Sequence, residues 1–341
     1  MRNIGKKYLV VGNMGYVGSV LVKQLRQQVP DVFLVGYDLG IFSHCLSSDC
    51  QIPELCLDIQ YFGDARSFDR KVLDGCDGLV YLAAISNDPM GKMYESLTDE
   101  VNYRSCIRWA KAAKDAGVRS FVLASSCSVY GTADDSPKKE TDPLNPLTAY
   151  ARSKINAETS LEKLADKSFY ITCLRFATAC GMSDRLRTDL VLNDFVFNVL
   201  ETGKIDILSN GKPWRPLIDV SDMARAIQWG LQREGDNFLT INAGSNKWNF
   251  QVLALAENVQ SFFPDALISI NENAPEDNRS YRVDFSLFEK LAFNYRVNIS
   301  IKDSIMNLVD GIKSIQSKNL DKSSFIRLSV LKKYLEKNSV V

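Results

Sequence analysis

Histidine is nearly absent from this chain: His44 is the one histidine among 341 residues. A catalytic histidine base would therefore have to be His44, which lies in a polar stretch remote from the other candidate residues. This excludes a Ser-His-Asp hydrolase and an HExxH metalloprotease as working hypotheses. The eight cysteines form no C-x-x-C pair, and several lie in apolar runs such as "ITCLRF", where cysteine acts as a small hydrophobic residue. We predict no metal site.

Excess charge and long apolar runs are also missing. Lys plus Arg number 41 and Asp plus Glu number 41, so no net field attracts nucleic acid or a membrane surface. No run of about 18 apolar residues occurs, which excludes a bilayer-spanning helix. Glycines interrupt the first apolar segment too early for a signal peptide. We expect a cytoplasmic protein.

Short apolar runs alternate with helical patterns over the first 176 residues. The runs that predict strands are "KKYLVVG", "DVFLVGYD", "ELCLDI", "GLVYLAA", "SFVLASS" and "FYITCLRF". Helices are expected at about 64–73, 92–116 and 150–166. Strands that are apolar on both faces and alternate with helices indicate an α/β fold with a doubly wound parallel sheet of the Rossmann type.

Beyond residue 176 the pattern loosens and predicts a smaller α/β domain interleaved with the first. The run "FLTINAG" predicts a strand that returns to the first sheet. We expect the first domain to comprise 1–176 plus about 218–244, and the second to comprise about 177–217 and 245–317. A polar, Lys-rich tail at 318–341 has no assigned role, and both a loose helix and a subunit contact fit it.

The turn after the first strand, Gly12-Asn13-Met14-Gly15-Tyr16-Val17-Gly18, predicts a dinucleotide site. Its glycines permit a tight turn and a close approach to a diphosphate, and the helix N-terminus supplies N–H donors. Asp38 ends the second predicted strand, where a carboxylate accepts hydrogen bonds from ribose hydroxyls and repels a 2′-phosphate. The pattern therefore favours NAD over NADP. The predicted cofactor-binding residues are Gly12, Met14, Gly15, Tyr16, Val17, Gly18, Asp38, Asp58, Ile59, Leu82, Ala83 and Ala84.

Among these, Asp58 and Ile59 are expected at the end of the third strand, "ELCLDI", where they would flank the adenine. An ordinary loop aspartate would give the same pattern.

The stretch "LTAYARSKINAE" places Tyr150 four residues before Lys154 on one helical face. A phenol has a pKa of about 10 and is a poor base at neutral pH. A fixed ammonium nearby favours the phenolate, which would make Tyr150 a usable proton acceptor. The same spacing also arises by chance in ordinary helices, so the pair alone does not decide between the two interpretations.

With "YLAAISNDP", "SSCSVYG", "YARSK" and "LRFATACG" in this order, the chain resembles the extended short-chain dehydrogenase/reductase family over about residues 7–315. That family includes nucleotide-sugar epimerases, dehydratases and oxidases. The resemblance implies that Tyr150 takes a proton from a sugar hydroxyl while the same carbon gives a hydride to NAD. It also implies that Ser126 holds that oxygen and that Lys154 binds the nicotinamide ribose and assists Tyr150.

The resemblance also narrows the reaction. The 4,6-dehydratases of the family carry an acid two residues before the V-Y-G tyrosine, where this chain has Cys127 and Ser128. C4 oxidation or epimerisation is therefore favoured, with a 4,6-dehydratase as the alternative. A non-catalytic NAD-binding sensor is the alternative of another class. Such proteins tend to lose the Tyr or the Lys, and this chain has both.

The second half resembles the substrate domain of the same family and implies a nucleotide-diphospho-sugar ligand. Guanidinium groups suit diphosphate oxygens because their planar fork matches the oxygen geometry. The run "SDRLRTDLVLNDF" is similar to GDP-heptose C4 oxidases. The family also pairs long helices between subunits, so helices at 92–116 and 144–166 predict a homodimer or a tetramer. The implied substrate-binding residues are Ser86, Asn87, Ser128, Arg187, Asn193, Arg215 and Arg279.

Overall fold

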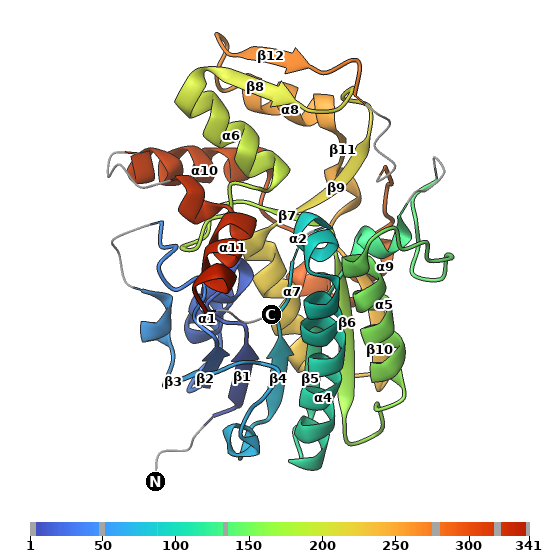
Figure 1. Ribbon diagram of the computed structural model, residues 1–341. Coiled ribbons are helices and arrows are strands. Elements are labelled where there is room, and N and C mark those ends of the chain that lie inside the picture. The colour runs from blue at the N-terminus through green and yellow to red at the C-terminus, as the bar shows by residue number, and fades with distance from the viewer. Residues whose placement is uncertain are drawn as a thin grey trace.

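The computed structural model describes residues 5–47, 52–86, 88–131, 136–274, 280–316 and 322–338. Its central element is a seven-stranded sheet in the order β10-β6-β5-β4-β1-β2-β3 (Figure 1). All six pairings are parallel, which confirms the predicted doubly wound α/β fold. The strands are β1 Lys7–Val11, β2 Phe33–Asp38, β3 Ile59–Phe62, β4 Gly78–Tyr81, β5 Ser120–Ser126, β6 Tyr170–Phe176 and β10 Phe238–Ala243.

Helices cover both faces of this sheet, and each face has its own apolar core. On one face Leu21 and Leu25 of α1 pack with Ile227 of α7. On the other face Trp109 of α4 and Leu161 of α5 pack against the sheet. Burial on both faces explains why the central strands are continuous apolar runs. The helices around the sheet are α1 Tyr16–Gln28, α2 Asp88–Met93, α3 Glu95–Asp99, α4 Cys106–Asp115, α5 Ala149–Glu162, α7 Val220–Gln232 and α9 Ser286–Leu291, with a π-helix, η3, at Glu100–Ser105.

A second group of elements lies beyond the carboxyl ends of the seven strands, at the top of Figure 1. It contains a three-stranded sheet, β11-β9-β7, a two-stranded sheet, β12-β8, and a separate core that includes Phe195 and Leu308. Its elements are β7 Thr178–Cys180, α6 Val191–Thr202, β8 Lys204–Ile207, β9 Trp214–Asp219, β11 Asn249–Gln251, α8 Val252–Gln260, β12 Leu267–Ile270 and α10 Ile301–Gln316.

The expected returning strand is confirmed, because β10 pairs with β6. Two other local predictions are wrong. The run "ELCLDI" forms a 3₁₀ helix, η1, at Pro53–Cys56, and the third strand comes after it. Most of the expected helix at 64–73 is irregular, with only the 3₁₀ helix η2 at Arg70–Leu73.

Short helices and a C-terminal helix complete the chain. They are η4 Cys127–Tyr130, η5 Asn246–Trp248, η6 Phe293–Tyr295, η7 Lys322–Phe325 and α11 Arg327–Asn338. Within the described ranges, no helix has the length and apolar character that a membrane span requires.

Candidate active site

A cleft of about 1780 Å³ opens where the parallel strands end. Segments that follow β1, β2, β3, β4, β5 and β6 form its floor, which is the usual ligand position in an open parallel sheet. The opposite wall comes from residues 187–195, from β9 and from the C-terminal helix α11. The cleft therefore brings together three parts of the chain that are distant in sequence.

The glycine turn after β1 is fixed by contacts that leave no room for side chains. Gly12 has a positive φ of 91°, and a Cβ there would lie 2.5 Å from the backbone nitrogen of Ala83. A Cβ on Gly18 would lie 2.5 Å from the Asn13 carbonyl oxygen, so this glycine allows α1 to pack closely on the turn. Gly15 caps α1 without any side-chain bond to the helix N-terminus. The first backbone N–H groups of α1 thus border the cleft and suit a diphosphate.

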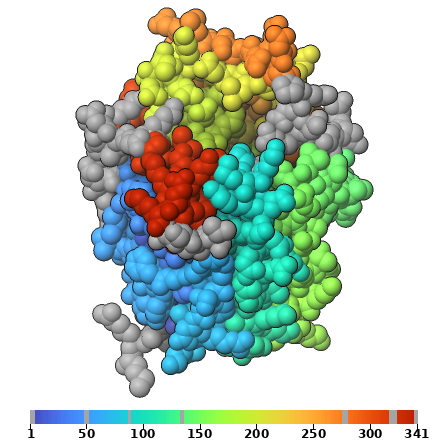
Figure 2. All heavy atoms as spheres, in the orientation of Figure 1, coloured from blue at the N-terminus to red at the C-terminus, as the bar shows by residue number. Residues whose placement is uncertain are grey.

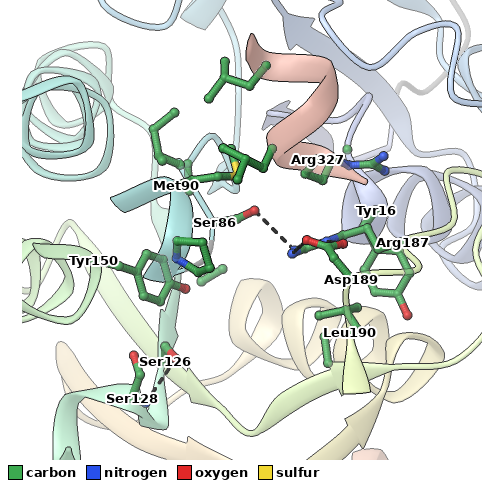
Figure 3. Close-up of a pocket in the computed structure, with 18 of the residues that line it drawn as sticks. Tyr16, Ser86, Met90, Ser126, Ser128, Tyr150, Arg187, Asp189, Leu190 and Arg327 are labelled. Atoms are coloured by element: carbon green, nitrogen blue, oxygen red, sulfur yellow. Dashed lines mark hydrogen bonds and ion pairs between the residues drawn. The ribbon is translucent and has the colours of Figure 1, made fainter. Parts of the chain in front are cut away.

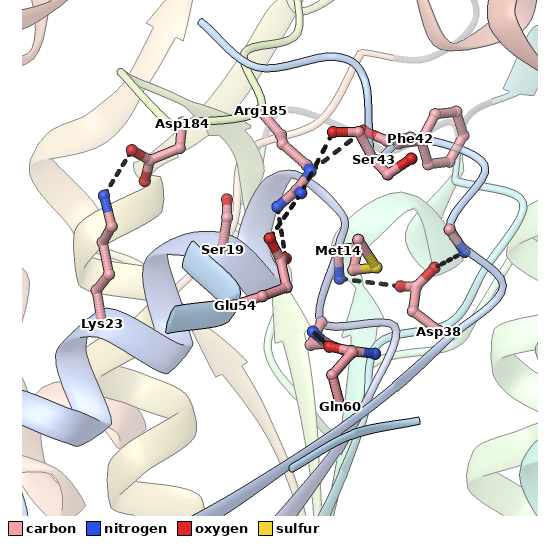
Figure 4. A network of polar contacts seen from close by, with 12 residues as sticks. Met14, Ser19, Lys23, Asp38, Phe42, Ser43, Glu54, Gln60, Asp184 and Arg185 are labelled. Atoms are coloured by element: carbon pink, nitrogen blue, oxygen red, sulfur yellow. Dashed lines mark hydrogen bonds and ion pairs between the residues drawn. The ribbon is translucent and has the colours of Figure 1, made fainter. Parts of the chain in front are cut away.

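Asp38 lies at the end of β2, next to this turn (Figure 4). One carboxylate oxygen accepts a hydrogen bond from the Met14 backbone N–H at 2.9 Å, and the other accepts from Gly40 at 2.8 Å. Burial raises the pKa of Asp38 even though these bonds favour the charged form. Met14, a predicted cofactor-binding residue, does not itself line the cleft, and its backbone N–H is taken up by Asp38. A carboxylate beside the glycine turn, together with the uncapped helix, fits the ribose and diphosphate of NAD.

Asp58 and Ile59 do not lie where they were expected. Because β3 starts at Ile59, both residues lie at the amino end of the strand, and neither lines the cleft. The Asp58 carboxylate instead accepts from Arg26 at 2.6 Å and from the Leu34 backbone N–H at 2.7 Å. The predicted contact with the adenine is wrong for these two residues.

The cleft is lined at that point by residues 63–66, which follow β3 and which the sequence analysis missed. Asp64 accepts hydrogen bonds from the Arg66 side chain, the shortest at 2.6 Å. Burial raises the pKa of Asp64, but the bonds from Arg66 outweigh it, and the pKa is lowered. A Gly-Asp pair directly after a strand was the signal that could have found this segment.

The segment after β4 lies across the cleft floor. Leu82 and Ala83 donate their backbone N–H groups to the Val11 carbonyl, which holds this segment against the glycine turn. Together with Ala84, the third residue of this segment that was predicted to bind the cofactor, they line the cleft.

Tyr150 and Lys154 both line the cleft from the start of α5. The Lys154 ammonium lies 5.5 Å from the centre of the Tyr150 ring and donates to the Ala124 carbonyl at 2.7 Å. Lys154 is buried, and burial lowers its pKa to about 8. A Cβ on Gly91 of α2 would lie 3.3 Å from Tyr150, so α2 packs directly on the start of α5.

Ser126 and Ser128 line the same wall of the cleft as Tyr150 (Figure 3). The Ser126 hydroxyl accepts a hydrogen bond from the Ser128 backbone N–H at 3.2 Å and caps η4. The Ser128 hydroxyl is buried and has no hydrogen-bond partner among the described residues. Cys127 points into the core instead, where its thiol contacts the Arg175 carbonyl at 3.1 Å and burial raises its pKa.

Arg187 and Ser86 meet on the other side of the cleft (Figure 3). The Arg187 guanidinium donates to the Ser86 hydroxyl at 3.2 Å and forms a two-point ion pair with Asp189, at 3.0 and 2.8 Å. Burial opposes both charges, but their mutual attraction prevails: the pKa of Arg187 is raised and that of Asp189 is lowered. The pair is therefore a fixed, ionised part of the wall.

Asn193 does not reach the cleft. It is fully buried, its carbonyl oxygen accepts from the Gly181 N–H at 2.9 Å, and its amide donates to the Arg187 carbonyl at 2.9 Å and the Tyr16 hydroxyl at 3.3 Å. Tyr16 in turn donates to the Gly181 carbonyl at 2.6 Å. This network ties the first turn of α1 to the segment that carries Arg187. The structure thus gives Asn193 a positioning role and does not bring it to the diphosphate.

The remaining predicted substrate residues have mixed outcomes. Arg215 of β9 lines the cleft, and its guanidinium donates to the Trp214 carbonyl at 2.9 Å. Asn87 and Arg279 lie outside the described residues. Val17 and Gly18 line the cleft as predicted for the cofactor site.

Several named proteins are similar in sequence to most of this chain. UDP-glucose 4-epimerase of Streptomyces lividans is 30% identical over 272 residues, covering 74% of this chain and 80% of the relative. UDP-glucuronic acid decarboxylase 1 of Arabidopsis thaliana is 24% identical over 91% of this chain and 71% of the relative. The solved UDP-glucuronic acid 4-epimerase from Bacillus cereus, in complex with UDP-glucuronic acid and NAD, has a TM-score of 0.77 at 22% identity, covering 91% of this chain and 99% of that chain. The structural likeness supports the fold.

A family model described as the NAD dependent epimerase/dehydratase family matches residues 8–244. This match agrees with the motifs around Ser126 and Tyr150 and with the glycine turn. It confirms the predicted family resemblance, and the NAD dependence in the description confirms the predicted cofactor. The chain therefore belongs to the NAD dependent epimerase/dehydratase family, and it is an NAD-dependent enzyme.

Proposed function

We propose that this enzyme acts on a nucleotide-diphospho-sugar and oxidises it at C4, with a proton leaving the C4 hydroxyl and a hydride leaving the C4 carbon, giving C4 epimerisation or C4 oxidation. One observation carries the proposal: Ser126, Tyr150 and Lys154 line one cleft with the glycine turn that fits NAD. Bound NAD would accept the hydride that the sugar carbon loses. The choice of C4 rests on the resemblance of the motifs to the family.

Each of the three residues has a role that its position supports. Tyr150 takes the proton of the sugar hydroxyl, because a phenolate is a base that reaches into the cleft. Lys154 holds a positive charge 5.5 Å from the Tyr150 ring and so favours that phenolate. Ser126 donates a hydrogen bond to the sugar oxygen and keeps it oriented toward Tyr150.

Dehydration of the 4,6 type is disfavoured by the residues beside Ser126. Cys127 is buried in the core and Ser128 carries a neutral hydroxyl, so neither supplies an acid for loss of water.

A substrate with a carboxyl group attached to C5 would react differently after oxidation at C4. Oxidation at C4 turns such a sugar into a β-keto acid, which loses CO₂ readily. Decarboxylation is thus compatible with the same first step, as the name of the Arabidopsis relative illustrates.

The proposed nucleotide and sugar are based on the residues that line the cleft and on the similarity of the chain to other proteins. We propose that Arg215 binds the substrate diphosphate, and that Arg187 and Ser86 shape the sugar pocket. The segment 183–195 resembles GDP-heptose oxidases, while the named relatives act on UDP-sugars. A substrate panel should therefore contain both nucleotides.

We further propose a homodimer through α4 and α5, which light scattering of the purified protein would test.

The variant Tyr150→Phe tests the proposed chemistry. Loss of the phenol should lower kcat at least about 100-fold, because proton transfer by a positioned side chain contributes that much. Calorimetry should show unchanged affinity for NAD and for the nucleotide-sugar. Tyr103→Phe is a matched control: its hydroxyl bonds Ser160 of α5 at 3.2 Å and does not line the cleft. Equal activity of the two variants would refute the role of Tyr150 as base.

A further inference from the structure

The C-terminal helix α11 lies over the cleft, although it follows all the sequence motifs. Leu331 is buried against Ile85 and Met90, and a wider apolar contact is made with Ile41, Tyr94, Leu97, Leu328 and Leu335. In Figure 2 the red C-terminal segment fills the front of the molecule between the blue N-terminal region, the cyan α2 region and the yellow elements above. The helix thus spans the cleft from the segment after β2 to α2 and α3.

Arg327, the first residue of α11, has an unusual environment. It is 2% exposed and lines the cleft. One terminal nitrogen, Nη2, donates to the Arg185 carbonyl at 2.7 Å, and the guanidinium lies 4.6 Å from the centre of the Phe42 ring. The other terminal nitrogen, Nη1, is buried and has no hydrogen-bond partner among the described residues. A buried charged donor without an acceptor is costly, so this nitrogen marks a position for a ligand atom.

The surrounding charges do not neutralise Arg327. Arg185 forms a two-point ion pair with Glu54 at 2.9 and 3.0 Å, and Arg187 uses both oxygens of Asp189. No described carboxylate forms an ion pair with Arg327. The buried guanidinium groups of Arg185, Arg187 and Arg327 thus lie near only two paired carboxylates, those of Glu54 and Asp189. The positive charge of Arg327 at the cleft wall is therefore not balanced by an ion pair within the described residues. Burial and the nearby Arg187 lower the pKa of Arg327 to about 10, so it stays charged at neutral pH.

We propose that Nη1 of Arg327 binds a diphosphate oxygen in the cleft, and that this oxygen belongs to the cofactor. Phe42 follows β2 closely, so Arg327 lies at the end of the cleft where Asp38 and the glycine turn meet. Figure 3 places Arg327 on the same side as Tyr16 of α1, with Tyr150 and Ser126 on the far side. The position therefore matches the cofactor diphosphate rather than the sugar.

This contact couples cofactor binding to the docking of α11. Arg327 and the apolar residues Leu328 and Leu331 belong to one helix, so the ion contact and the apolar cover form or break together. NAD would leave only after α11 moves. The inference rests on the NAD site of the proposed function, and it implies that NAD is released slowly.

Calorimetry on the full chain, stripped of cofactor, tests the assignment with NAD and with UDP as separate probes. Arg327→Gln should weaken NAD binding about tenfold or more, because a charge-assisted hydrogen bond is lost. It should also speed NAD release in a chase experiment. Lys333→Gln is the matched control: Lys333 lies on the same helix, is exposed and donates to the Ser323 hydroxyl at 3.1 Å, so NAD binding should not change. Thermal unfolding without ligand shows whether each variant is folded, and Arg327→Lys serves as a second variant if Arg327→Gln is not.

Three results would overturn the assignment. Equal NAD affinity of the Arg327 variants and Lys333→Gln would show that Arg327 binds no cofactor oxygen. A loss confined to UDP would assign Arg327 to the substrate diphosphate. Unchanged NAD release would remove the coupling to α11. Because the readout is NAD binding, the test is independent of Tyr150: an enzyme that binds NAD through Arg327 but converts no sugar would disprove the proposed function alone.

Discussion

Lys154 is the residue whose environment most constrains the proposed chemistry. Its ammonium is buried and faces the Ala124 carbonyl, which is a weak substitute for water. Burial therefore lowers its pKa to about 8, close to neutral pH. The sequence indicated the pairing with Tyr150 but not this shift, because burial is a property of the folded chain.

We expect the kcat/KM of the free enzyme to fall as the pH rises above about 8, because a neutral Lys154 no longer favours the phenolate of Tyr150. A pH–rate profile in buffers of constant ionic strength measures this.

The contribution of Lys154 to the free energy of unfolding should instead increase as the pH rises. Unfolded lysine keeps its proton to about pH 10.4, so between about 8 and 10.4 the unfolded state binds more protons and this group makes stability increase with pH. An activity that stays constant from about pH 7 to 10 would contradict the role of Lys154.

Asn193 shows where residue-level prediction fails. The motif placed it near a diphosphate, but its amide and carbonyl are used up by Gly181, Arg187 and Tyr16. Which partner a buried polar side chain finds depends on tertiary packing, and no local pattern specifies it.

Among the structural elements, the glycine turn between β1 and α1 needs glycine for two reasons: the backbone must fold there, and NAD must bind there. Gly12→Ala should destabilise the fold by about 1–3 kcal/mol, because it forces a positive φ and a clash with the Ala83 backbone. Gly15→Ala should cost much less, since its Cβ would meet only the Gly12 carbonyl, at 3.4 Å. Denaturant unfolding of the two variants measures the difference.

The two glycine variants also separate folding from binding. Gly15 borders the cleft, so Gly15→Ala should lose NAD affinity while it stays folded. Equal stability of the two variants would show that the close approach of Gly12 to Ala83 is not a structural constraint.

Two elements show the limits of periodicity. The apolar run 54–59 was predicted as a strand, but Pro53 starts a 3₁₀ helix there and the true edge strand, β3, is half exposed. Short apolar runs do not distinguish these states. The tail at 318–341 was assigned no role, because a loose helix and a subunit contact both fit its polar sequence. Leu328, Leu331 and Leu335 nevertheless have helical spacing, and that signal predicts the apolar face of α11.

For the whole molecule, alternating strands and helices were enough to predict the parallel sheet and the strand that returns as β10. They were not enough to predict the cleft wall. Arg187, Arg215 and Arg327 come from three separate segments, and only the packed chain shows that all three line one cavity.

The exposed residues of α4 and α5 include Arg108, Lys111 and Arg152. A homodimer through these helices would therefore have a polar interface.

The central claim is tested most directly by the product. Purified enzyme, without added cofactor, is incubated with UDP-glucose, UDP-glucuronic acid and GDP-heptose, and the product is followed by NMR and by the near-ultraviolet absorbance of NADH. The account predicts a change at C4 in at least one substrate: an inverted centre without net NADH for an epimerase, or a ketone with equivalent NADH for an oxidase. Unaltered sugars in protein that demonstrably binds NAD would contradict it, and so would any product, other than a decarboxylated sugar, in which C4 is untouched.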